Sequence, residues 1–381
     1  MQVTVNGKAR PFRTVTFDAS LNQVRLIEQR DLPHEFKIVA TKTFRETAAA
    51  IRDMVVRGAG AIAATAAYGL AQGATAFRGA DRKRFFQHVQ LVYRTLKNAR
   101  PTAVDPVNAM DAVRATMRRG KSVAEQQALA HAAAEEFANT DVHHCEAIGR
   151  QGANLIRDGM RILTHCNAGW LAFVDVGSAT APLYAAQAAG RHFHVLCNET
   201  RPRSQGATLT AWELAQQRIS HEIIVGGAAG PLMQRGEVDL VIVGSDRTLG
   251  RTGEVANKIG TYTLAVLAQR HRIPFYVAIP LSTLDWQLRR GSEIPIENRA
   301  AAEVLGAWGV PANPTVKPTT GKRTQRTYIR VANPTSTARN PAFDVTPAEL
   351  ITGIITPVGI FKPAELWKHR IQLGYKTCTE N

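Results

Sequence analysis

The most informative segment of the chain reads Met160-Arg161-Ile162-Leu163-Thr164-His165-Cys166-Asn167-Ala168-Gly169. Its first four residues have the apolar character of a short buried strand, and its end opens a segment rich in Gly and Ala. Open α/β sheets carry their reactive groups at the carboxyl ends of the strands. The stretch therefore predicts a sheet edge that presents Cys166.

Further strand-like runs follow this stretch, with helical segments between them. The expected strands are 160–164, 192–197, 222–225, 240–243 and 275–278, and the expected helices are 181–190, 208–218 and 258–271. Alternation of strands and helices at this spacing is typical of a parallel sheet with helices on both faces. We therefore predict an α/β fold for this part of the chain.

A second sheet edge is expected at Gly244-Ser245-Asp246-Arg247, after the apolar run 238–243. A thiol and a carboxyl group on two edges of one sheet can work as an acid–base pair, so Cys166 and Asp246 are the candidate catalytic residues. The alternatives are a buried structural thiol for Cys166, and a helix cap or an ion pair with Arg247 for Asp246. His165 is not expected to serve Cys166 as a base, because adjacent strand residues point to opposite faces.

The chain before residue 158 has a different pattern. Residues 1–40 alternate apolar and polar positions, which indicates short strands or hairpins. A helical pattern follows, with expected helices at 43–56, 59–76, 81–98, 108–120 and 122–138. We predict an N-terminal, mainly helical domain with short strands over residues 1–145, and an α/β catalytic domain over residues 146–381.

The charge balance is strongly basic. The 381 residues carry a formal net charge of +16, which nucleic acid, an anionic substrate or a merely basic surface would each explain. The cations are dispersed and no basic run is interleaved with aromatic residues, so nucleic acid is not expected as a partner. The four cysteines lack metal-ligand spacing and suit a reducing compartment, so no metal is expected.

Two segments bear on the location of the protein. The N-terminus shows no apolar signal segment, so a cytoplasmic location is expected. Residues 58–77 carry no charge, but their high content of Ala, Gly and Thr favours a closely packed, buried helix over a membrane span.

Two arginines are candidates for binding an anion. Arg57-Gly58-Ala59 leads into an apolar helix, and a guanidinium beside the free N–H groups of a helix start suits a phosphate. Close helix packing would also explain the small residues there. Arg100 stands before Pro101 at a helix end, where it either offsets the helix dipole or holds the same phosphate.

Two later segments can add polar groups to the same site. The stretch from Asn198 to Gln205 follows another expected strand, and is either a capped loop or part of the sheet edge. Asn257 and Lys258 are expected to open the helix 258–271. A lysine at a helix start opposes the helix dipole, which favours a bound anion.

Residues 305–340 contain six cations and no acidic residue, and four prolines interrupt them. This composition predicts a long, partly extended loop with a hairpin around Thr327–Val331. Long loops in compact domains are commonly functional or disordered.

Together these motifs resemble those of the methylthioribose-1-phosphate isomerases. The wider superfamily includes ribose-1,5-bisphosphate isomerases and the regulatory subunits of a translation initiation factor's exchange factor. The matching segments follow in the same order: Val56–Ile62, Arg100–Val104, Thr164–Ala172, Glu199–Leu214, Gly244–Arg247, Gly253–Tyr262, Ile273–Asp285, Ile294–Arg299 and Asn340–Thr356.

The resemblance implies a helical N-terminal domain, a Rossmann-like C-terminal domain and a homodimer. It implies catalytic roles for Cys166 and Asp246. It further implies substrate contacts from Arg57, Gly58, Ala59, Arg100, Gln205, Asn257 and Lys258. No nucleotide cofactor is expected, because no Gly-x-Gly-x-x-Gly follows a strand.

The chain departs from the family pattern around this site. The departures are Gly60, Asp105-Pro106, Val176, Asn198, Gly226-Gly227 and Ser245, where the family usually has Pro, Asn-Leu, an aromatic residue, Asp, a polar pair and Ala. None of them replaces Cys166 or Asp246. The departures therefore concern the identity of the substrate more than the type of reaction.

The expected activity is the isomerisation of 5-methylthioribose 1-phosphate to 5-methylthioribulose 1-phosphate, in methionine salvage. The anomeric oxygen carries the phosphate, so the ring must open while the phosphate stays attached. One group must protonate the ring oxygen, and a base must move a proton from C2 to C1; Cys166 and Asp246 would share these tasks. The alternatives are the same chemistry on 5-deoxyribose 1-phosphate or ribose 1,5-bisphosphate, and a non-catalytic protein like the regulatory subunits.

Overall fold

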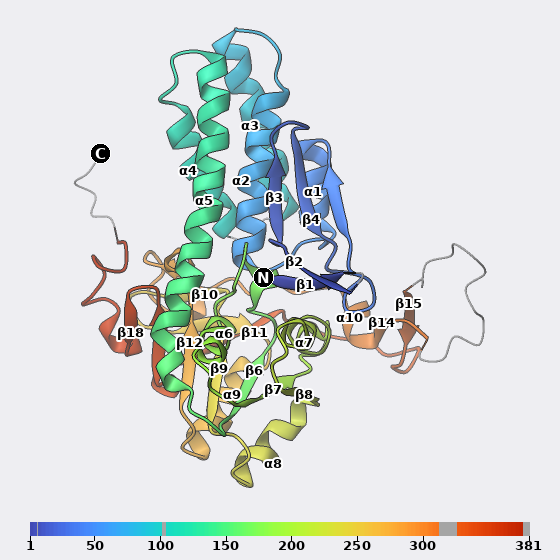
Figure 1. Ribbon diagram of the computed structural model, residues 1–381, viewed down its shortest axis with the longest axis vertical. Coiled ribbons are helices and arrows are strands. Elements are labelled where there is room, and N and C mark those ends of the chain that lie inside the picture. The colour runs from blue at the N-terminus through green and yellow to red at the C-terminus, as the bar shows by residue number, and fades with distance from the viewer. Residues whose placement is uncertain (6, 101–103, 312–325, 376–381) are drawn as a thin grey trace.

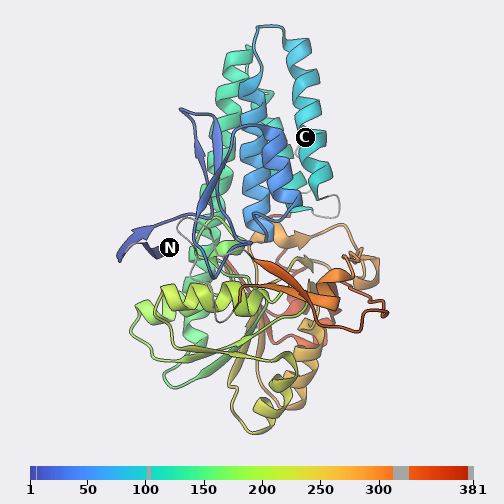
Figure 2. The same cartoon turned by 90° about the vertical axis from the view of Figure 1, so that its right-hand side faces the viewer.

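A bundle of helices stands on a larger α/β unit (Figures 1 and 2). The structure is a computed structural model that describes residues 1–5, 7–100, 104–311 and 326–375. Pro101, Thr102 and Ala103 of the family-like segment Arg100–Val104 lie outside the described residues. So do Lys317, Lys322 and Arg323 of the basic loop, and Cys378.

The N-terminal helices lie close to the predicted segments, although the helix predicted at 108–120 begins and ends three residues earlier. They are α1 (Phe44–Arg52), α2 (Ala59–Ala76), α3 (Arg82–Ala99), α4 (Asp105–Met117) and α5 (Val123–Gly152). α2 lies at the centre of the bundle, in contact with the other four helices, and it is buried from Gly60 to Ala74. Its small side chains allow this close packing, as the uncharged run predicted. No helix in the described ranges is long and apolar enough to cross a membrane.

Helix α5 is longer than the sequence predicted. The pattern predicted an end at Ala138, but buried positions continue at helical spacing through Asp141, Cys145 and Ile148. No proline interrupts this pattern, so α5 leaves the bundle and continues along the α/β unit, where it contacts helix α6 and strand β17 (Figure 1). The predicted domain boundary at residue 145 falls inside this helix.

Short strands precede the helices, as the alternation in residues 1–40 predicted. They are β1 (Gln2–Val5), β2 (Lys8–Pro11), β3 (Val15–Asp18), β4 (Gln23–Ile27) and β5 (Ile38–Thr41). β1 and β2 form a hairpin, and β3, β4 and β5 form an antiparallel sheet. Val15, Val24 and Leu26 of that sheet share the core of the helical bundle.

A seven-stranded sheet forms the centre of the C-terminal part, in the order β18-β17-β12-β9-β6-β7-β8. The strands are β6 (Arg161–His165), β7 (His194–Asn198), β8 (His221–Ile224), β9 (Leu240–Val243), β12 (Phe275–Ala278), β17 (Gly353–Thr356) and β18 (Gly359–Phe361). All neighbours are parallel except β18. After β6 the chain adds β7 and β8 on one side of that strand, and it then adds β9 and the later strands on the other side. This reversal of direction is the topology of Rossmann-like sheets. The predicted fold class is confirmed.

Helices cover both faces of this sheet. They are α6 (Ala181–Ala188), α7 (Ala211–Gln216), α8 (Ala229–Gln234) and α9 (Thr261–Arg270). Side chains alternate along the strands: Ile162 packs with α5, α6 and α7, whereas its neighbour Leu163 packs with α8 and α9. The continuous apolar runs of the sequence thus reflect strands that are buried on both faces.

Two predicted helices differ from the expected bounds. The segment 208–218 starts as a π-helical turn over Gly206–Thr210 and continues as α7. The segment 258–271 is α9 only from Thr261, because Asn257 and Lys258 belong to strand β11 (Val255–Lys258). Gly260, with a φ of 102°, makes the turn between them. The expectation that Lys258 opens a helix and opposes its dipole is therefore wrong.

A smaller sheet and a hairpin complete the fold. The sheet has the order β13 (Leu284–Asp285), β10 (Arg247–Leu249), β11 and β16 (Phe343–Thr346). After helix α10 (Ala302–Leu305), β14 (Gly306–Gly309) pairs antiparallel with β15 (Thr327–Arg330). This pairing confirms the hairpin expected around residue 327, which projects from the α/β unit (Figure 1).

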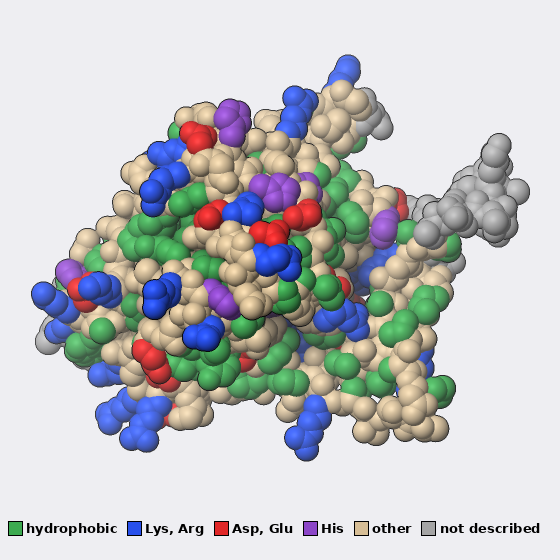
Figure 3. All heavy atoms as spheres, turned by 90° about the horizontal axis from the view of Figure 1, so that it is seen from below, with side chains coloured by type: hydrophobic (Ala, Val, Ile, Leu, Met, Phe, Trp, Pro, Cys, Tyr) green, Lys and Arg blue, Asp and Glu red, His purple; other side chains and the backbone are tan. Residues whose placement is uncertain are grey.

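Basic side chains are dispersed over the face seen in Figure 3. Lys and Arg lie there among hydrophobic and acidic side chains and do not gather into one basic stripe. This distribution agrees with the dispersed charge in the sequence.

Candidate active site

Cys166 and Asp246 lie at the carboxyl ends of two neighbouring strands. Cys166 directly follows β6, and Asp246 comes three residues after Val243, the end of β9. β6 and β9 pair with each other at the point where the strand order reverses. Open α/β sheets bind their ligands at this switch point. The structure therefore brings the predicted thiol and carboxyl group to one place.

An open cleft of about 1010 Å³ covers this edge. It is lined by all the predicted site residues except Asn257: Arg57, Gly58, Ala59, Arg100, Cys166, Gln205, Asp246 and Lys258. Six cationic side chains line the cleft against two acidic ones. Such an excess of positive charge suits an anionic ligand. Across the described ranges, no group of three His, Cys, Asp or Glu side chains could hold a metal ion.

The start of helix α2 faces the cleft. Gly58, with a φ of 93°, precedes the helix, and a Cβ atom there would lie 2.4 Å from the Cα of Ala172. Glycine is therefore required for the helix start to pass so close to the segment after Cys166. The first N–H groups of a helix have no partner within it, and Gly58 and Ala59 line the cleft. The helix start is thus placed to bind an anion.

Cys166 is held by two threonines. Its φ is 63°, its N–H donates to Oγ1 of Thr200 at 2.8 Å, and its carbonyl accepts from Oγ1 of Thr210 at 2.7 Å. The side chain is 8% exposed and lines the cleft, so it is not merely a core thiol. Burial raises the pKa of the thiol, while the charges of Arg57 and Lys258 lower it; the net effect is a raised pKa.

Asp246 is exposed to the cleft and can therefore reach a ligand. The dense protein around the cleft raises the pKa of its carboxyl group, against the opposing charges of Lys258, Arg57 and Arg100. Asp246 precedes strand β10 and no helix, so it is not a helix cap. Arg247 pairs with Asp285 at 3.3 Å instead. Both alternative roles considered for Asp246 are therefore wrong.

His165 faces away from this chemistry. Its Nε2 donates to the carbonyl of Ile259 at 2.9 Å, and burial lowers the pKa of the ring to about 4. A neutral imidazole engaged in this way agrees with the expectation that His165 does not serve Cys166.

Lys258 reaches the cleft, whereas its neighbour Asn257 does not. Nζ of Lys258 donates to the carbonyl of Ala342 at 3.1 Å, and burial lowers the pKa of the ammonium group, against the charges of Cys166 and Asp246. Asn257 is 5% exposed and donates to Oγ1 of Thr261 at 3.0 Å. Adjacent strand residues point to opposite faces, so only one of the two can face a ligand in the cleft.

Gln205 presents an unsatisfied acceptor in the cleft. Its side chain is 7% exposed, and its Oε1 has no hydrogen-bond partner in the described part of the chain. Buried polar atoms are almost always hydrogen-bonded, so this oxygen is suited to a donor from a ligand, such as a hydroxyl group.

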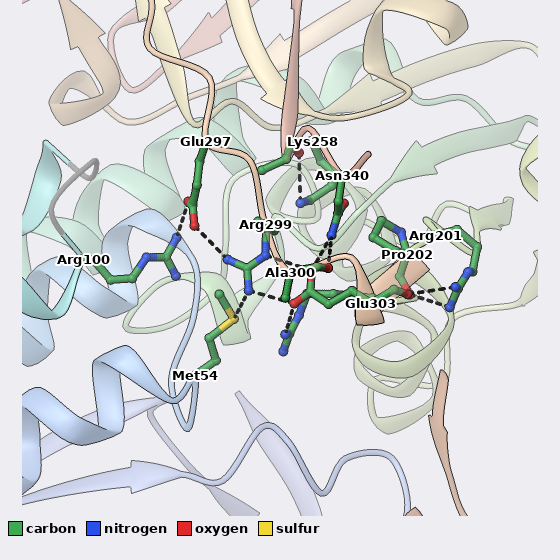
Figure 4. A network of polar contacts seen from close by, with 12 residues as sticks. Met54, Arg100, Arg201, Pro202, Lys258, Glu297, Arg299, Ala300, Glu303 and Asn340 are labelled. Atoms are coloured by element: carbon green, nitrogen blue, oxygen red, sulfur yellow. Dashed lines mark hydrogen bonds and ion pairs between the residues drawn. The ribbon is translucent and has the colours of Figure 1, made fainter. Parts of the chain in front are cut away.

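A polar network fixes three arginines at the cleft, and two of them were missed by the sequence reasoning (Figure 4). Arg299 pairs with Glu303 at 2.8 Å and with Glu297 at 3.2 Å. Glu297 also pairs with Arg100 at 3.4 Å, and Glu303 pairs with Arg203 at 2.8 Å. Burial alone would raise the pKa of Glu303, but Arg299 and Arg203 lower it to about 2. Arg203 and Arg299 lie in two of the segments that resemble the family, and this resemblance could have identified them as residues of the site.

Glu213 organises the turn behind Cys166. It is fully buried, and its carboxylate accepts hydrogen bonds from the N–H groups of Trp170 and Leu171, from Nδ2 of Asn167 and from the hydroxyl of Tyr184, at 2.9–3.1 Å. Asn167 in turn accepts a hydrogen bond from the guanidinium of Arg57. Glu213 therefore positions Arg57 at the cleft through Asn167.

We expect Glu213→Gln to impair both folding and activity. Oε1 of Glu213 accepts the main-chain N–H of Leu171 and Oε2 accepts that of Trp170. An amide NH₂ group in either position would therefore face a donor, and a buried unsatisfied donor costs about 1–3 kcal/mol. The midpoint of thermal unfolding should fall, and kcat/KM should fall about tenfold because Arg57 loses its support. Tyr184→Phe is the control, since it removes one donor and adds none. A Glu213→Gln variant with unchanged melting temperature and kcat/KM would contradict this role.

Only one group of departures from the family pattern reaches the cleft. Asp105 and Pro106 line it, and burial together with the charge of Asp246 raises the pKa of Asp105 to about 7. Asn198 acts behind the site: its Oδ1 accepts the N–H of Thr200 at 3.1 Å, and Thr200 holds Cys166. The other departures are absent from the cleft lining.

Comparison with known proteins gives consistent matches. The Initiation factor 2 subunit family matches residues 55–363. The methylthioribose-1-phosphate isomerase of Brucella anthropi is 45% identical over 365 residues, which cover 93% of this chain and 95% of that protein. The crystal structure of 5-methylthioribose 1-phosphate isomerase from Pyrococcus horikoshii OT3 has a TM-score of 0.82 and 37% identity, over 96% of each chain. The crystal structure of a translation initiation factor eIF-2B subunit delta from A. fulgidus has a TM-score of 0.79 and 37% identity, over 96% of this chain and 100% of that one.

Proposed function

Because this chain belongs to the initiation factor 2 subunit family and, within it, to the methylthioribose-1-phosphate isomerases, we propose that the cleft at Cys166 and Asp246 is its active site. The chain is an aldose–ketose isomerase that converts 5-methylthioribose 1-phosphate to 5-methylthioribulose 1-phosphate in methionine salvage. One observation carries the assignment of the site. The thiol, the carboxyl group and the start of helix α2 all line a single cleft with an excess of cations.

The phosphate of the substrate binds at the start of helix α2. The N–H groups of Gly58 and Ala59 and the guanidinium of Arg57 hold it there, with Arg100 and Lys258 as further cations. A phosphate attached to C1 then lies beside Cys166 and Asp246. Gln205 accepts a hydrogen bond from a sugar hydroxyl through its unsatisfied Oε1.

Cys166 and Asp246 share the proton transfers. The ring of the substrate opens when its oxygen receives a proton, and the isomerisation then moves a proton from C2 to C1. Burial raises the pKa of both groups above their usual values, and this shift favours the protonated form that general acid catalysis requires. The buried walls of the cleft limit the loss of these protons to water.

We further propose a homodimer in the cytoplasm. The edge strand β8 exposes Ile223 (52%), and Val225 (64%) follows it, which offers an apolar surface for a second copy. Light scattering coupled to size-exclusion chromatography measures the mass directly, and a monomer at micromolar concentration would reject the dimer.

Turnover of the purified protein on 5-methylthioribose 1-phosphate tests the function. 5-Deoxyribose 1-phosphate and ribose 1,5-bisphosphate should be assayed in parallel, with formation of the ketose followed by NMR. We expect conversion of the methylthio substrate, with the highest kcat/KM of the three. Absence of conversion of any of them would reject the assignment and leave only the family and the fold.

A further inference from the structure

His165 directly precedes Cys166 but takes no part in the proposed proton transfers. It ends strand β6 on the same face of the sheet as Leu163, which packs with helices α8 and α9. Its side chain is 4% exposed and is absent from the cleft lining, so it lies behind the cleft. Burial of a polar ring is costly unless the ring makes hydrogen bonds. The contacts of His165 therefore show what it does there.

One side of the ring holds the turn that follows Lys258. Burial lowers the pKa of His165 to about 4, so the ring is neutral near neutral pH and has one N–H group. This group is on Nε2, which donates to the carbonyl of Ile259 at 2.9 Å. The N–H of Ile259 donates to the carbonyl of Ala342, which also accepts a hydrogen bond from Nζ of Lys258. The ring thus fixes the main chain next to the lysine.

Gly260 allows the ring to approach this turn closely. A Cβ atom at this position would lie 3.1 Å from Cε1 of His165 and 3.3 Å from its Nε2, closer than side chains normally pack. The carboxylate of Asp344 holds the turn as well, because it accepts the N–H groups of Gly260 at 2.6 Å and of Tyr262 at 3.1 Å. The turn therefore has a fixed position relative to the imidazole.

The other side of the ring faces the residue that holds Cys166. Nδ1 of His165 lies 3.5 Å from Oγ1 of Thr200, which accepts the main-chain N–H of Cys166 at 2.8 Å. The hydroxyl proton of Thr200 goes to the carbonyl of Asn198 at 2.7 Å. Because Nδ1 carries no proton, it does not compete with the N–H of Cys166 for the oxygen of Thr200. The ring thus lies between the thiol turn and the lysine turn.

The two groups that these turns carry act on each other through their charges. The ammonium group of Lys258 lowers the pKa of the Cys166 thiol, and the thiol in turn raises the pKa of Lys258. The other charges that face the thiol are those of Arg57, which lowers its pKa, and Asp246, which raises it. Arg57 is held from a different segment. A displacement of the lysine turn would therefore weaken the effect of Lys258 and leave that of Arg57 in place.

We propose that His165 is a positioning residue, which through its hydrogen bond to Ile259 holds the ammonium group of Lys258 in place beside Cys166. The proposal rests on the proposed function, because it takes the thiol and the lysine as groups of one active site. It assigns no proton transfer to His165, which serves the site through its shape and its single N–H donor.

Two substitutions that differ only in reach test the hydrogen bond. The amide nitrogen of glutamine can reach the position of Nε2, whereas that of asparagine reaches only the position of Nδ1. A neighbouring charge shifts a pKa by about 1–3 units, and a loosened lysine should lose part of this effect. We therefore expect His165→Asn to raise the pKa of the Cys166 thiol by about half a unit or more, and His165→Gln to leave it within about 0.2 unit. The thiolate is the reactive form, so the rate of alkylation by iodoacetamide against pH, followed at Cys166 by mass spectrometry, measures this pKa.

The same two variants should differ in activity. A misplacement of about 1 Å in an active site can cost about 10²-fold. We expect kcat/KM on 5-methylthioribose 1-phosphate to fall about 10–100-fold in His165→Asn and less than about threefold in His165→Gln. His131→Asn is the matched control, because His131 is a half-buried histidine that contacts Oγ1 of Thr75 at 2.7 Å within the helical bundle. This control can lower the melting temperature but should leave the thiol pKa unchanged.

A double substitution tests whether the effect passes through the lysine. Lys258→Met removes the ammonium group, so the further change His165→Asn should then move the thiol pKa by less than about 0.2 unit. The proposal is overturned by an equal shift with and without Lys258, or by equal thiol pKa values in His165→Asn and His165→Gln. Alkylation requires no turnover. Failure of the proposed function would therefore appear separately, as a wild-type protein that converts no substrate.

Discussion

Cys166→Ser is expected to lower kcat/KM by about 10²–10⁴-fold, the range that a positioned acid–base group contributes. The serine hydroxyl has nearly the same size but gives up its proton far less readily than a thiol. The two threonine contacts to the backbone of Cys166 remain, so the turn keeps its shape. Binding of the product, measured by calorimetry, should therefore change little while kcat falls.

Cys197→Ser is the matched control for this experiment. Cys197 lies on the neighbouring strand β7, is fully buried and is absent from the cleft lining. Its replacement can affect stability but should leave kcat within about threefold of the wild type, well short of the loss of an acid–base group. If Cys166→Ser itself keeps activity within about tenfold of the wild type, Cys166 has no acid–base role.

The sequence was sufficient where one local pattern decides the structure. The helix α2 and the strands β9 and β12 have the predicted bounds, because continuous apolar runs between charged or turn residues mark buried elements clearly. The same reasoning placed Cys166 and Asp246 at strand ends, and the parallel topology then brings all such ends to one edge of the sheet.

Pairing between distant segments could not be predicted in this way. Lys258 belongs to a strand because β11 pairs with β16, where it lies opposite Phe343. A local pattern contains no information about that partner, so Asn257 and Lys258 were assigned to the helix that follows. The same limit applies to Arg203 and Glu303, which are 100 residues apart and meet only in the folded chain. Tertiary context of this kind overrides local propensity.

Asp246→Asn is expected to lower kcat/KM by about 10²–10⁴-fold, for the same reason as Cys166→Ser. The amide is close in size to the carboxyl group but cannot exchange a proton at the substrate. The dependence of kcat on pH then shows whether Asp246 acts as an acid or as a base. If Asp246 acts as the acid, kcat falls as the pH rises through its raised pKa, and if it acts as the base, kcat rises there. In both cases this limb of the profile should vanish in the variant.

Asp105 must be separated from Asp246 in that profile, because it also lines the cleft and its pKa is raised to about 7. Asp105→Asn should keep the limb that belongs to Asp246 but shift it to lower pH. The substitution removes a neighbouring negative charge, and this lowers the pKa of Asp246. If the limb is lost in Asp105→Asn and kept in Asp246→Asn, the proton transfer belongs to Asp105, and our assignment of it to Asp246 is wrong.

The Asp246→Asn substitution should lower the activity of the protein without lowering its stability to unfolding. The folded chain binds the proton of Asp246 more tightly than the unfolded chain does, because the pKa is raised on folding. Stability is therefore lost as the pH rises from the unfolded pKa through the raised folded value, and the loss is complete above it. Asp246→Asn removes this loss, so its melting temperature at pH 8 should be no lower than that of the wild type. If the variant is both inactive and markedly less stable, Asp246 stabilises the fold. The carboxyl group would then not be a residue that lowers the stability of the protein in exchange for activity.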